Sequence, residues 1–171
     1  MKTNGSSGFC IPYAIRVTPD KGRGVFADAV VRKGAILWRH VPGQFAVYDE
    51  RSFKERLGAL SQSEAVYELT HSFGLPEFPG YMIRVLDDGV LINHSSQPTV
   101  AMNNGSTEDR VPSVASAQEV EEALLDDRFA LIAAKDLEVG DELTQDYNTD
   151  VDDPFYYDAL CEEYGVTWEW L

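Results

Sequence analysis

The sequence predicts a mostly β domain, and three features of the chain lead to this fold class. Its apolar residues fall in many short runs, each bounded by glycine, proline or charged residues of the kind that form turns. Helical patterns are confined to a few segments. A chain of 171 residues with a hydrophobic fraction of 44% is long enough for one domain with a core and too short for two. Many short strands with little helix are typical of a mostly β domain.

The first strands are expected around a glycine-rich turn. Residues 13–17 and 25–27 are predicted strands, and the Lys-Gly-Arg-Gly segment at 21–24 is a predicted turn between them. Apolar and aromatic runs at 35–39 and 44–48 are separated by a Val-Pro-Gly sequence. This arrangement predicts a hairpin.

Two helices and a second hairpin are expected in the middle of the chain. The helices cover about residues 50–60 and 61–73, and the second opens with Ser-Gln-Ser-Glu, the pattern of a capping box. Residues 81–86 and 90–92 are predicted strands, and the Asp-Asp-Gly sequence between them is typical of a tight hairpin turn.

The last third of the chain begins with a polar, acidic stretch at 104–127, which is expected to be a surface insertion with a short helix at 118–125. Strands are predicted at 129–133 and 142–145, with a turn between them. The remaining tail is rich in acidic and aromatic residues. Its aromatic residues include Phe155, Tyr156, Tyr157, Tyr164, Trp168 and Trp170.

The charge balance narrows the classes of partner. The chain has 29 Asp and Glu against 14 Lys and Arg, for a formal net charge of −15. Such a chain repels phosphate backbones, so direct nucleic-acid binding is not expected, and it attracts cationic partners such as lysine-rich peptide tails. The same acidity also keeps a protein soluble, so charge alone identifies no partner.

Other features argue against whole classes of site. No apolar run reaches the roughly 20 residues that span a bilayer, so no membrane partner is expected. The polar start of the chain lacks the parts of a signal peptide, and residues 1–11 are expected to be a flexible leader. Cys10 and Cys161 lie far apart, which argues against a disulfide scaffold and a cysteine-built zinc site. We therefore expect the protein to be intracellular. It would lie in the cytoplasm, or in the nucleus if the organism is a eukaryote.

Three segments carry groups that could do chemistry, although each alone is weak. Gly22 and Gly24 would let a ligand approach the backbone, but such a segment also makes an ordinary turn, and it matches neither a dinucleotide fingerprint nor a P-loop. The Asn-His-Ser sequence at 93–95 lacks further metal ligands at a suitable spacing. Its adjacent side chains would point to opposite faces of a strand, which disfavours a Ser–His pair. Tyr147 alone reads as a half-buried aromatic at a strand end.

In their order along the chain, these segments resemble one family. The stretches are Lys-Gly-Arg-Gly-Val-Phe-Ala at 21–27, Asp-Asp-Gly-Val-Leu-Ile-Asn-His-Ser-Ser-Gln-Pro-Thr at 87–99, and the run at 129–147 that ends in Asp-Tyr. Together they resemble the SET-domain protein lysine methyltransferases, which use S-adenosyl-L-methionine.

The resemblance implies how the chain is organised. It implies a SET-domain, β-clip-like fold at residues 12–148, made of several small sheets with a C-terminal pseudoknot in which the Asn-His-Ser and Asp-Tyr segments meet. Threaded chains are rare, so this feature rests on the resemblance alone. A helical insert is expected at about residues 49–75 and the acidic insertion at about 104–127. Residues 149–171 would form an aromatic segment that closes the site.

The resemblance also implies a cofactor site. The backbone around Gly22, Arg23 and Gly24 would hold the methionine part of S-adenosyl-L-methionine. Asn93 and the backbone of His94 would bind its amino and adenine groups.

The same resemblance makes Tyr147 the catalytic residue at the methyl-transfer centre. Gln145, Tyr147 and Phe155 would line the channel for the substrate lysine. Trp168 would cover the cofactor, although Trp170 could take this place, and both could equally anchor the C-terminus in the core.

The chemistry of the transfer suits such parts. A lysine ammonium, with a pKa near 10.4, cannot attack until it loses a proton. A narrow apolar channel near the cationic sulfonium would lower that pKa. Sulfur, methyl and nitrogen must be collinear, so orientation is a large part of the catalysis. A fixed phenol can supply orientation without acting as a strong base, and no metal is required.

Three positions depart from the family pattern. Ser96 stands where many relatives have a zinc-binding cysteine, and the tail offers only Cys161. We therefore expect a small stand-alone member without cysteine-rich zinc segments before or after the domain. Thr99 replaces a common asparagine. Gln145 replaces a common Phe or Tyr, and because its amide can hydrogen-bond the amine, we expect fewer methyl groups to be added.

The resemblance thus implies a protein-lysine N-methyltransferase that acts on a basic protein tail, such as a histone-like tail. One alternative is a SET-like module that has lost transfer activity and only binds protein. The presence of Tyr147 and both motif glycines counts against it. Another is a β-rich scaffold whose motif matches are accidental. Cofactor binding and methyl transfer, measured together, separate the three.

Overall fold

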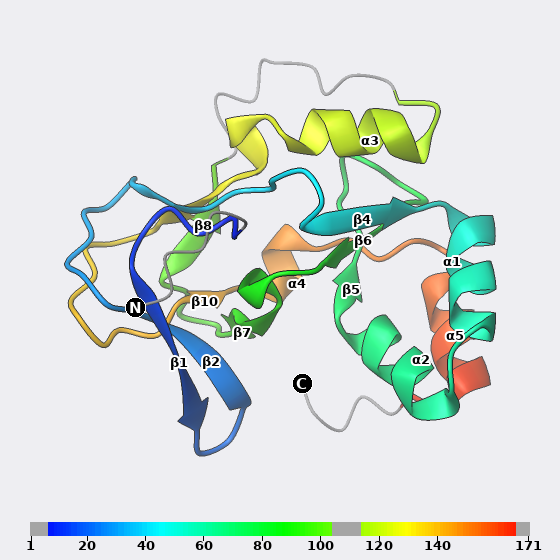
Figure 1. Ribbon diagram of the computed structural model, residues 1–171, viewed down its shortest axis with the longest axis horizontal. Helices are drawn as coiled ribbons and strands as arrows, with labels where there is room; N and C mark the ends of the chain where they lie inside the picture. Colours follow the sequence, from blue (N-terminus) through cyan, green and yellow to red (C-terminus); the bar gives the residue numbers. More distant parts are fainter. Residues whose placement is uncertain (1–6, 104–113, 167–171) are drawn as a thin grey trace.

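The computed structural model describes residues 7–103 and 114–166 and arranges them as several small sheets, with helices grouped at one end and another helix across the top (Figure 1). The strands in these ranges are β1 (Tyr13–Thr18), β2 (Gly22–Ala27), β3 (Ile36–Trp38), β4 (Phe45–Tyr48), β5 (Ser72–Phe73), β6 (Met82–Val85), β7 (Asn93–His94), β8 (Val100–Met102), β9 (Leu131–Ala133) and β10 (Thr144–Gln145). The helices are α1 (Glu50–Gly58), α2 (Gln62–Thr70), α3 (Ala117–Leu124), α4 (Tyr147–Asp150) and α5 (Tyr157–Tyr164), with 3-10 turns η1 (Asp88–Leu91) and η2 (Asp127–Phe129).

Each sheet has only two or three strands. β1 and β2 form an antiparallel pair, β9 lies between β3 and β8, and β6 lies between β4 and β5. The fourth sheet is the parallel pair of β7 and β10. Because each sheet is small, the apolar residues gather in separate clusters between the sheets and helices rather than in one layer.

Neither of the two predicted hairpins forms. β3 pairs with β9 and β4 pairs with β6, so the two strands expected to form the first hairpin lie in different sheets. The predicted strand at 90–92 is largely the 3-10 turn η1. Here the Asp87 carboxylate accepts hydrogen bonds from the Gly89 backbone N–H at 2.8 Å and the Trp38 indole at 3.1 Å. Such an Asp side chain closes a local turn in place of a hairpin ladder.

The expected flexible leader is packed from Gly8 onward. The Gly8 N–H donates to the Asp87 carboxylate at 2.6 Å, and the Gly8 carbonyl accepts from the Arg39 N–H at 3.0 Å. A Cβ at Gly8 would lie 2.1 Å from the Arg39 carbonyl oxygen, so only glycine fits. Phe9 forms a β-bridge with Trp38. Residues 1–6 lie outside the described residues.

The helical insert packs against the C-terminal helix. The capping box predicted for α2 is present, because the Ser61 N–H donates to the Glu64 carboxylate at 2.9 Å. Figure 1 shows α5 beside α1 and α2. The hydroxyls of Tyr156 and Tyr157 donate to the carbonyls of Gly80 (3.1 Å) and Leu69 (2.9 Å). The aromatic start of the tail therefore anchors α5. The apolar cluster they share comprises Phe53, Leu57, Ala65, Leu69, Met82, Tyr156, Tyr157, Leu160 and Cys161.

The described part of the acidic stretch also contributes to the core. The predicted short helix is present as α3, which contacts β4. Its Val120 and Leu124 are buried against Phe45, Val47 and Phe78. α3 therefore packs one face onto an apolar cluster, and residues 104–113 of the stretch lie outside the described residues.

A buried ion pair and a buried histidine matter for stability. Glu68 on α2 accepts from Arg84 on β6 at 3.4 Å, and both side chains are only 8% exposed. This ion pair ties the helical insert to the β4–β6–β5 sheet. His40 lies between the rings of Trp38 and Phe45, at centroid distances of 4.6 and 4.9 Å. Its burial lowers the pKa of the imidazole to about 4.

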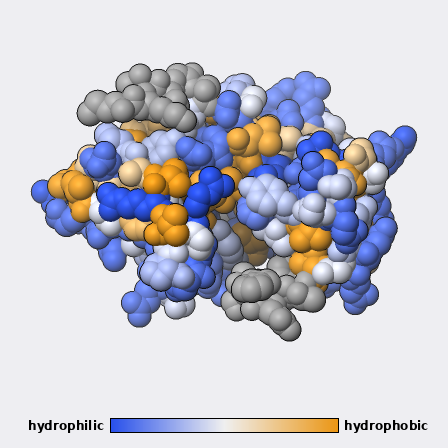
Figure 2. All heavy atoms as spheres, turned by 60° about the horizontal axis from the view of Figure 1, so that its bottom comes forward, coloured by the Kyte–Doolittle hydropathy of each residue, from blue (hydrophilic) through white to orange (hydrophobic). Residues whose placement is uncertain are grey.

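The surface is mixed in character. Figure 2 shows the lower face of the molecule with apolar residues in separate patches among hydrophilic ones. In the described ranges no helix combines the length and the apolar character that a membrane crossing needs.

Candidate active site

Two short parallel strands bring distant segments of the chain together (Figure 1). Asn93 and His94 on β7 lie opposite Thr144 and Gln145 on β10. The Ser95 N–H extends the pairing by donating to the Gln145 carbonyl at 3.0 Å. The predicted meeting of the Asn-His-Ser and Asp-Tyr segments therefore takes the form of a parallel β-pair.

A pair of threonines secures this arrangement. The Thr99 N–H donates to the Thr144 carbonyl at 3.0 Å, and the Thr144 N–H donates to the Thr99 hydroxyl at 2.9 Å. The Thr99 hydroxyl in turn donates to the Glu142 carbonyl at 2.7 Å. Thr99 thus uses its short side chain to hold β10 in place.

Tyr147 begins the short helix α4 rather than ending a strand. Its backbone N–H donates to His94 Nδ1 at 3.2 Å, so that nitrogen carries the lone pair. The two rings lie 5.5 Å apart. The Tyr147 hydroxyl donates to the Ile92 carbonyl. Although the residue as a whole is 37% exposed, burial raises the pKa of the Tyr147 phenol to about 12.

The glycine-rich strand β2 reaches the same place through Asn93. The Asn93 amide nitrogen donates to the Arg23 carbonyl at 3.2 Å and to Glu142 Oε1 at 2.8 Å. The Lys21 ammonium donates to the His94 carbonyl at 3.0 Å. Through Lys21 and Arg23, the glycine-rich segment is therefore joined to the β7 segment.

The two motif glycines have different reasons to be glycine. Gly22 has φ +78°, which side chains rarely adopt, and the space where its Cβ would lie is open. Gly24 has close neighbours, because a Cβ there would lie 2.6 Å from Glu142 Oε1 and 2.8 Å from Asn93 Nδ2. Sequence reasoning singled out neither Lys21 nor Glu142 as a site residue. A single lysine or acid beside a turn carries no signal that separates it from the surface charges of this chain.

The predicted channel residues are only partly brought together. Gln145 leads directly into α4, and its amide nitrogen donates to the Asp150 carboxylate at 3.0 Å. Phe155 is 84% exposed and lies against the ring of Tyr156, and the described contacts do not join it to Tyr147. Trp168 and Trp170 lie outside the described residues.

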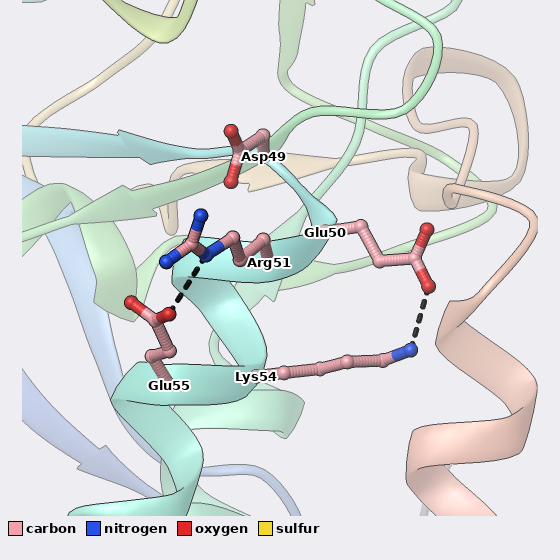
Figure 3. Close-up of a pocket in the computed structure, with 5 residues that line it drawn as sticks. All are labelled: Asp49, Glu50, Arg51, Lys54 and Glu55. Atoms are coloured by element: carbon pink, nitrogen blue, oxygen red, sulfur yellow. Dashed lines mark hydrogen bonds and ion pairs between the residues drawn. The ribbon is translucent and has the colours of Figure 1, made fainter.

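In a depression elsewhere on the surface, each charged side chain of the lining already has a partner within the chain. Figure 3 shows its lining at the start of α1, formed by Asp49, Glu50, Arg51, Lys54 and Glu55. Arg51 pairs with Glu55 at 2.9 Å and Lys54 with Glu50 at 2.6 Å. The Asp49 carboxylate caps α1 by accepting from the Ser52 N–H at 2.8 Å. Across the described residues, no cluster of three or more His, Cys, Asp or Glu side chains could hold a metal ion.

Comparison with known proteins agrees with this geometry. The SET domain profile matches residues 22–148, most of the chain. Histone-lysine N-methyltransferase ash1 of Drosophila melanogaster is 28% identical over 138 residues, which are 81% of this chain and 5% of that protein. The chain therefore spans only a small part of this curated relative.

Two solved structures share the fold. The Neurospora SET domain protein DIM-5, a histone lysine methyltransferase, aligns with a TM-score of 0.54 and 21% identity over 85% of this chain and 55% of that one. The methyltransferase domain of human histone-lysine N-methyltransferase SETMAR aligns with a TM-score of 0.52 and 20% identity over 81% of this chain and 45% of that one. At these identities the likeness concerns the fold. With the profile match over residues 22–148, it shows that the chain belongs to the SET-domain family.

Proposed function

We propose that this chain is an S-adenosyl-L-methionine-dependent protein-lysine N-methyltransferase that acts on a basic protein tail. The observation that carries the proposal is the convergence of three segments, in which Asn93 contacts Arg23 of the glycine motif and His94 contacts Tyr147. Membership in the SET-domain family supports it, as does the histone-lysine N-methyltransferase activity named for the relatives.

The polar groups at this convergence fit the cofactor. Asn93 directs its amide nitrogen to Arg23 and Glu142, so its Oδ1 remains to accept from the ammonium of the cofactor. The side chains of Lys21 and Arg23 suit the cofactor's carboxylate. The backbone of His94 offers a carbonyl and an N–H to the adenine. When bound, the cofactor supplies an electrophilic methyl group on a cationic sulfur.

The described contacts of Tyr147 support a positioning role in the transfer. A phenol with a pKa of about 12 keeps its proton at neutral pH and cannot deprotonate the lysine. Its hydroxyl hydrogen is directed to the Ile92 carbonyl, so the phenol oxygen can accept from the reacting groups and hold them in line. The substrate lysine must therefore lose its proton to solvent, with its pKa lowered by desolvation and by the nearby positive charge.

Gln145 is suited to orient the lysine nitrogen. The Asp150 carboxylate can only accept hydrogen bonds, so the Gln145 amide nitrogen must face it. Gln145 Oε1 then faces elsewhere and can accept an N–H from the lysine. This hydrogen bond exists only while the nitrogen still carries a hydrogen, which favours the addition of fewer than three methyl groups.

The charge of the chain supports a basic substrate. A net charge of −15 attracts lysine-rich tails over a long range and speeds their encounter with the site. Histones are one such substrate class, and the relatives named above act on histone lysine.

Incubation with isotope-labelled S-adenosyl-L-methionine and a panel of basic proteins tests the proposal. We expect label on lysine side chains, located by mass spectrometry, and heat of binding when the cofactor is titrated by calorimetry. Cofactor binding without transfer to any member of the panel would favour the inactive binding module. Neither binding nor transfer would contradict the proposal altogether.

A further inference from the structure

Glu142 occupies a fixed place behind Asn93. Its backbone forms a β-bridge with Phe26 of β2, and its carbonyl accepts from the Thr99 hydroxyl at 2.7 Å. These contacts hold Glu142 between the glycine-motif strand and the β7–β10 pair. Its side chain is directed to Asn93, where Oε1 accepts from Nδ2 at 2.8 Å.

This hydrogen bond determines which end of the Asn93 amide faces which way. The two ends of an asparagine amide have nearly the same shape but opposite hydrogen-bonding character. A carboxylate can only accept, so Glu142 admits the nitrogen end and excludes the oxygen end. The Arg23 carbonyl, at 3.2 Å from Nδ2, imposes the same choice. Asn93 Oδ1 is then held pointing away from Glu142 and the Arg23 carbonyl.

Gly24 makes room for this pair. A Cβ at position 24 would lie 2.6 Å from Glu142 Oε1 and 2.8 Å from Asn93 Nδ2, both closer than side-chain atoms tolerate. Gly24 is not among the glycines with a positive φ, so its backbone does not itself require glycine. Its lack of a side chain is therefore explained by the amide–carboxylate pair rather than by backbone strain.

We propose that Glu142 is a positioning residue that orients Asn93 Oδ1 toward the ammonium group of the cofactor, and that Gly24 is required because a side chain would displace the Asn93–Glu142 pair. This inference rests on the proposed function. It adds to that function a residue that acts through Asn93 without touching the substrate.

Calorimetric titration with S-adenosyl-L-homocysteine, which keeps the ammonium group, tests the inference without any substrate. We expect Glu142→Ala to weaken binding by about tenfold, the scale of a lost charge-assisted hydrogen bond. Glu142→Gln, whose amide oxygen can still accept from Asn93, should recover part of this affinity. Gly24→Ala should weaken binding to a similar extent as Glu142→Ala. Glu138→Gln changes an exposed acid on the preceding turn and should bind like the wild type.

A double-mutant cycle distinguishes positioning from direct contact. If Glu142 acts through Asn93, Glu142→Ala should cause no further loss of affinity in an Asn93→Ala background. An equal loss in both backgrounds would overturn the inference, because it would mean that Glu142 meets the cofactor itself. Thermal unfolding of each variant shows whether a loss comes from a damaged fold.

The two proposals fail in different ways. A wild-type chain that binds no S-adenosyl-L-homocysteine contradicts the proposed function. A wild-type chain that binds it while Glu142→Ala binds equally well contradicts only the role of Glu142. In turnover assays, a positioning role raises the KM for S-adenosyl-L-methionine more than it lowers kcat.

Discussion

Tyr147→Phe separates the role of the phenol in catalysis from its role in stability. The substitution removes one hydroxyl, which donates a neutral hydrogen bond to the Ile92 carbonyl. A bond of this kind contributes about 1 kcal/mol to the free energy of unfolding. For a chain of this size, such a loss lowers Tm by roughly 2–4 °C.

The expected effect on turnover is much larger. Loss of a group that orients the reacting atoms typically lowers kcat by about 100-fold, or roughly 3 kcal/mol of activation free energy. Cofactor affinity should stay close to that of the wild type, since Tyr147 contacts His94 through its backbone, which the substitution keeps. The assay measures kcat with labelled cofactor and a substrate peptide, together with calorimetric binding of S-adenosyl-L-homocysteine.

Tyr156→Phe is the matched control. It also removes a phenol that donates to a backbone carbonyl, that of Gly80 at 3.1 Å, but it lies in the cluster around α5. We expect a similar loss of stability and unchanged kcat. The reasoning would be refuted if Tyr147→Phe turned over within about threefold of the wild type, well short of the expected scale. It would also be refuted if cofactor affinity fell as much as kcat.

Three further predictions concern stability and product. Glu68→Ala should lower the free energy of unfolding by about 3 kcal/mol in urea titrations, because the buried Arg84 loses its carboxylate partner. Glu55→Ala, on the exposed face of α1, should change the free energy of unfolding little. The free energy of unfolding should fall as the pH drops from 6.5 to about 4. In this range the His40 imidazole takes up a proton in the unfolded chain but not in the folded one. Below pH 4 the loss in the free energy of unfolding reaches about 3 kcal/mol. His40→Phe should make the free energy of unfolding vary less with pH over this range. An unchanged pH dependence in this variant would show that His40 is not the group responsible. The wild-type enzyme, with Gln145 in place, should yield mainly mono- and dimethyl-lysine by mass spectrometry, and the Gln145→Phe variant should add more methyl groups. Mainly trimethyl-lysine from the wild type would contradict this role of Gln145.

The elements of the fold were easier to predict than their partners. The capping box of α2, the helix α3 and the strand β1 follow from residues within a few positions of one another. The hairpins were wrong because a turn sequence indicates where the chain bends, not which strands pair. β3 and β4 instead pair with β9 and β6, and their buried side chains belong to two different apolar clusters. For a related reason the part of the expected leader from Gly8 onward is packed, since the Gly8 N–H donates to Asp87, far along the chain.

In the candidate site, too, some residues could be predicted from the sequence and others could not. Asn93, His94 and Tyr147 could be named because the order of three motifs resembles a known family. Glu142 could not, because its importance lies in one 2.8 Å contact with a residue 49 positions away. Phe155 was named for its aromatic character, but its 84% exposed ring lies against Tyr156, which shows that residue type in a tail does not determine direction.

The sequence by itself determined the family, because the order of the motifs along the chain is specific to it. It also determined the helix caps, most strand positions and the need for glycine at the turn of Gly22, where φ is +78°. These features depend on local backbone preferences. Only the tertiary structure decided that β7 lies beside β10, that Tyr147 begins a helix with its hydroxyl on Ile92, and that Gly24 faces the Asn93–Glu142 pair. Those contacts join residues distant in sequence. They form only when several small sheets pack together, and no local pattern encodes that packing.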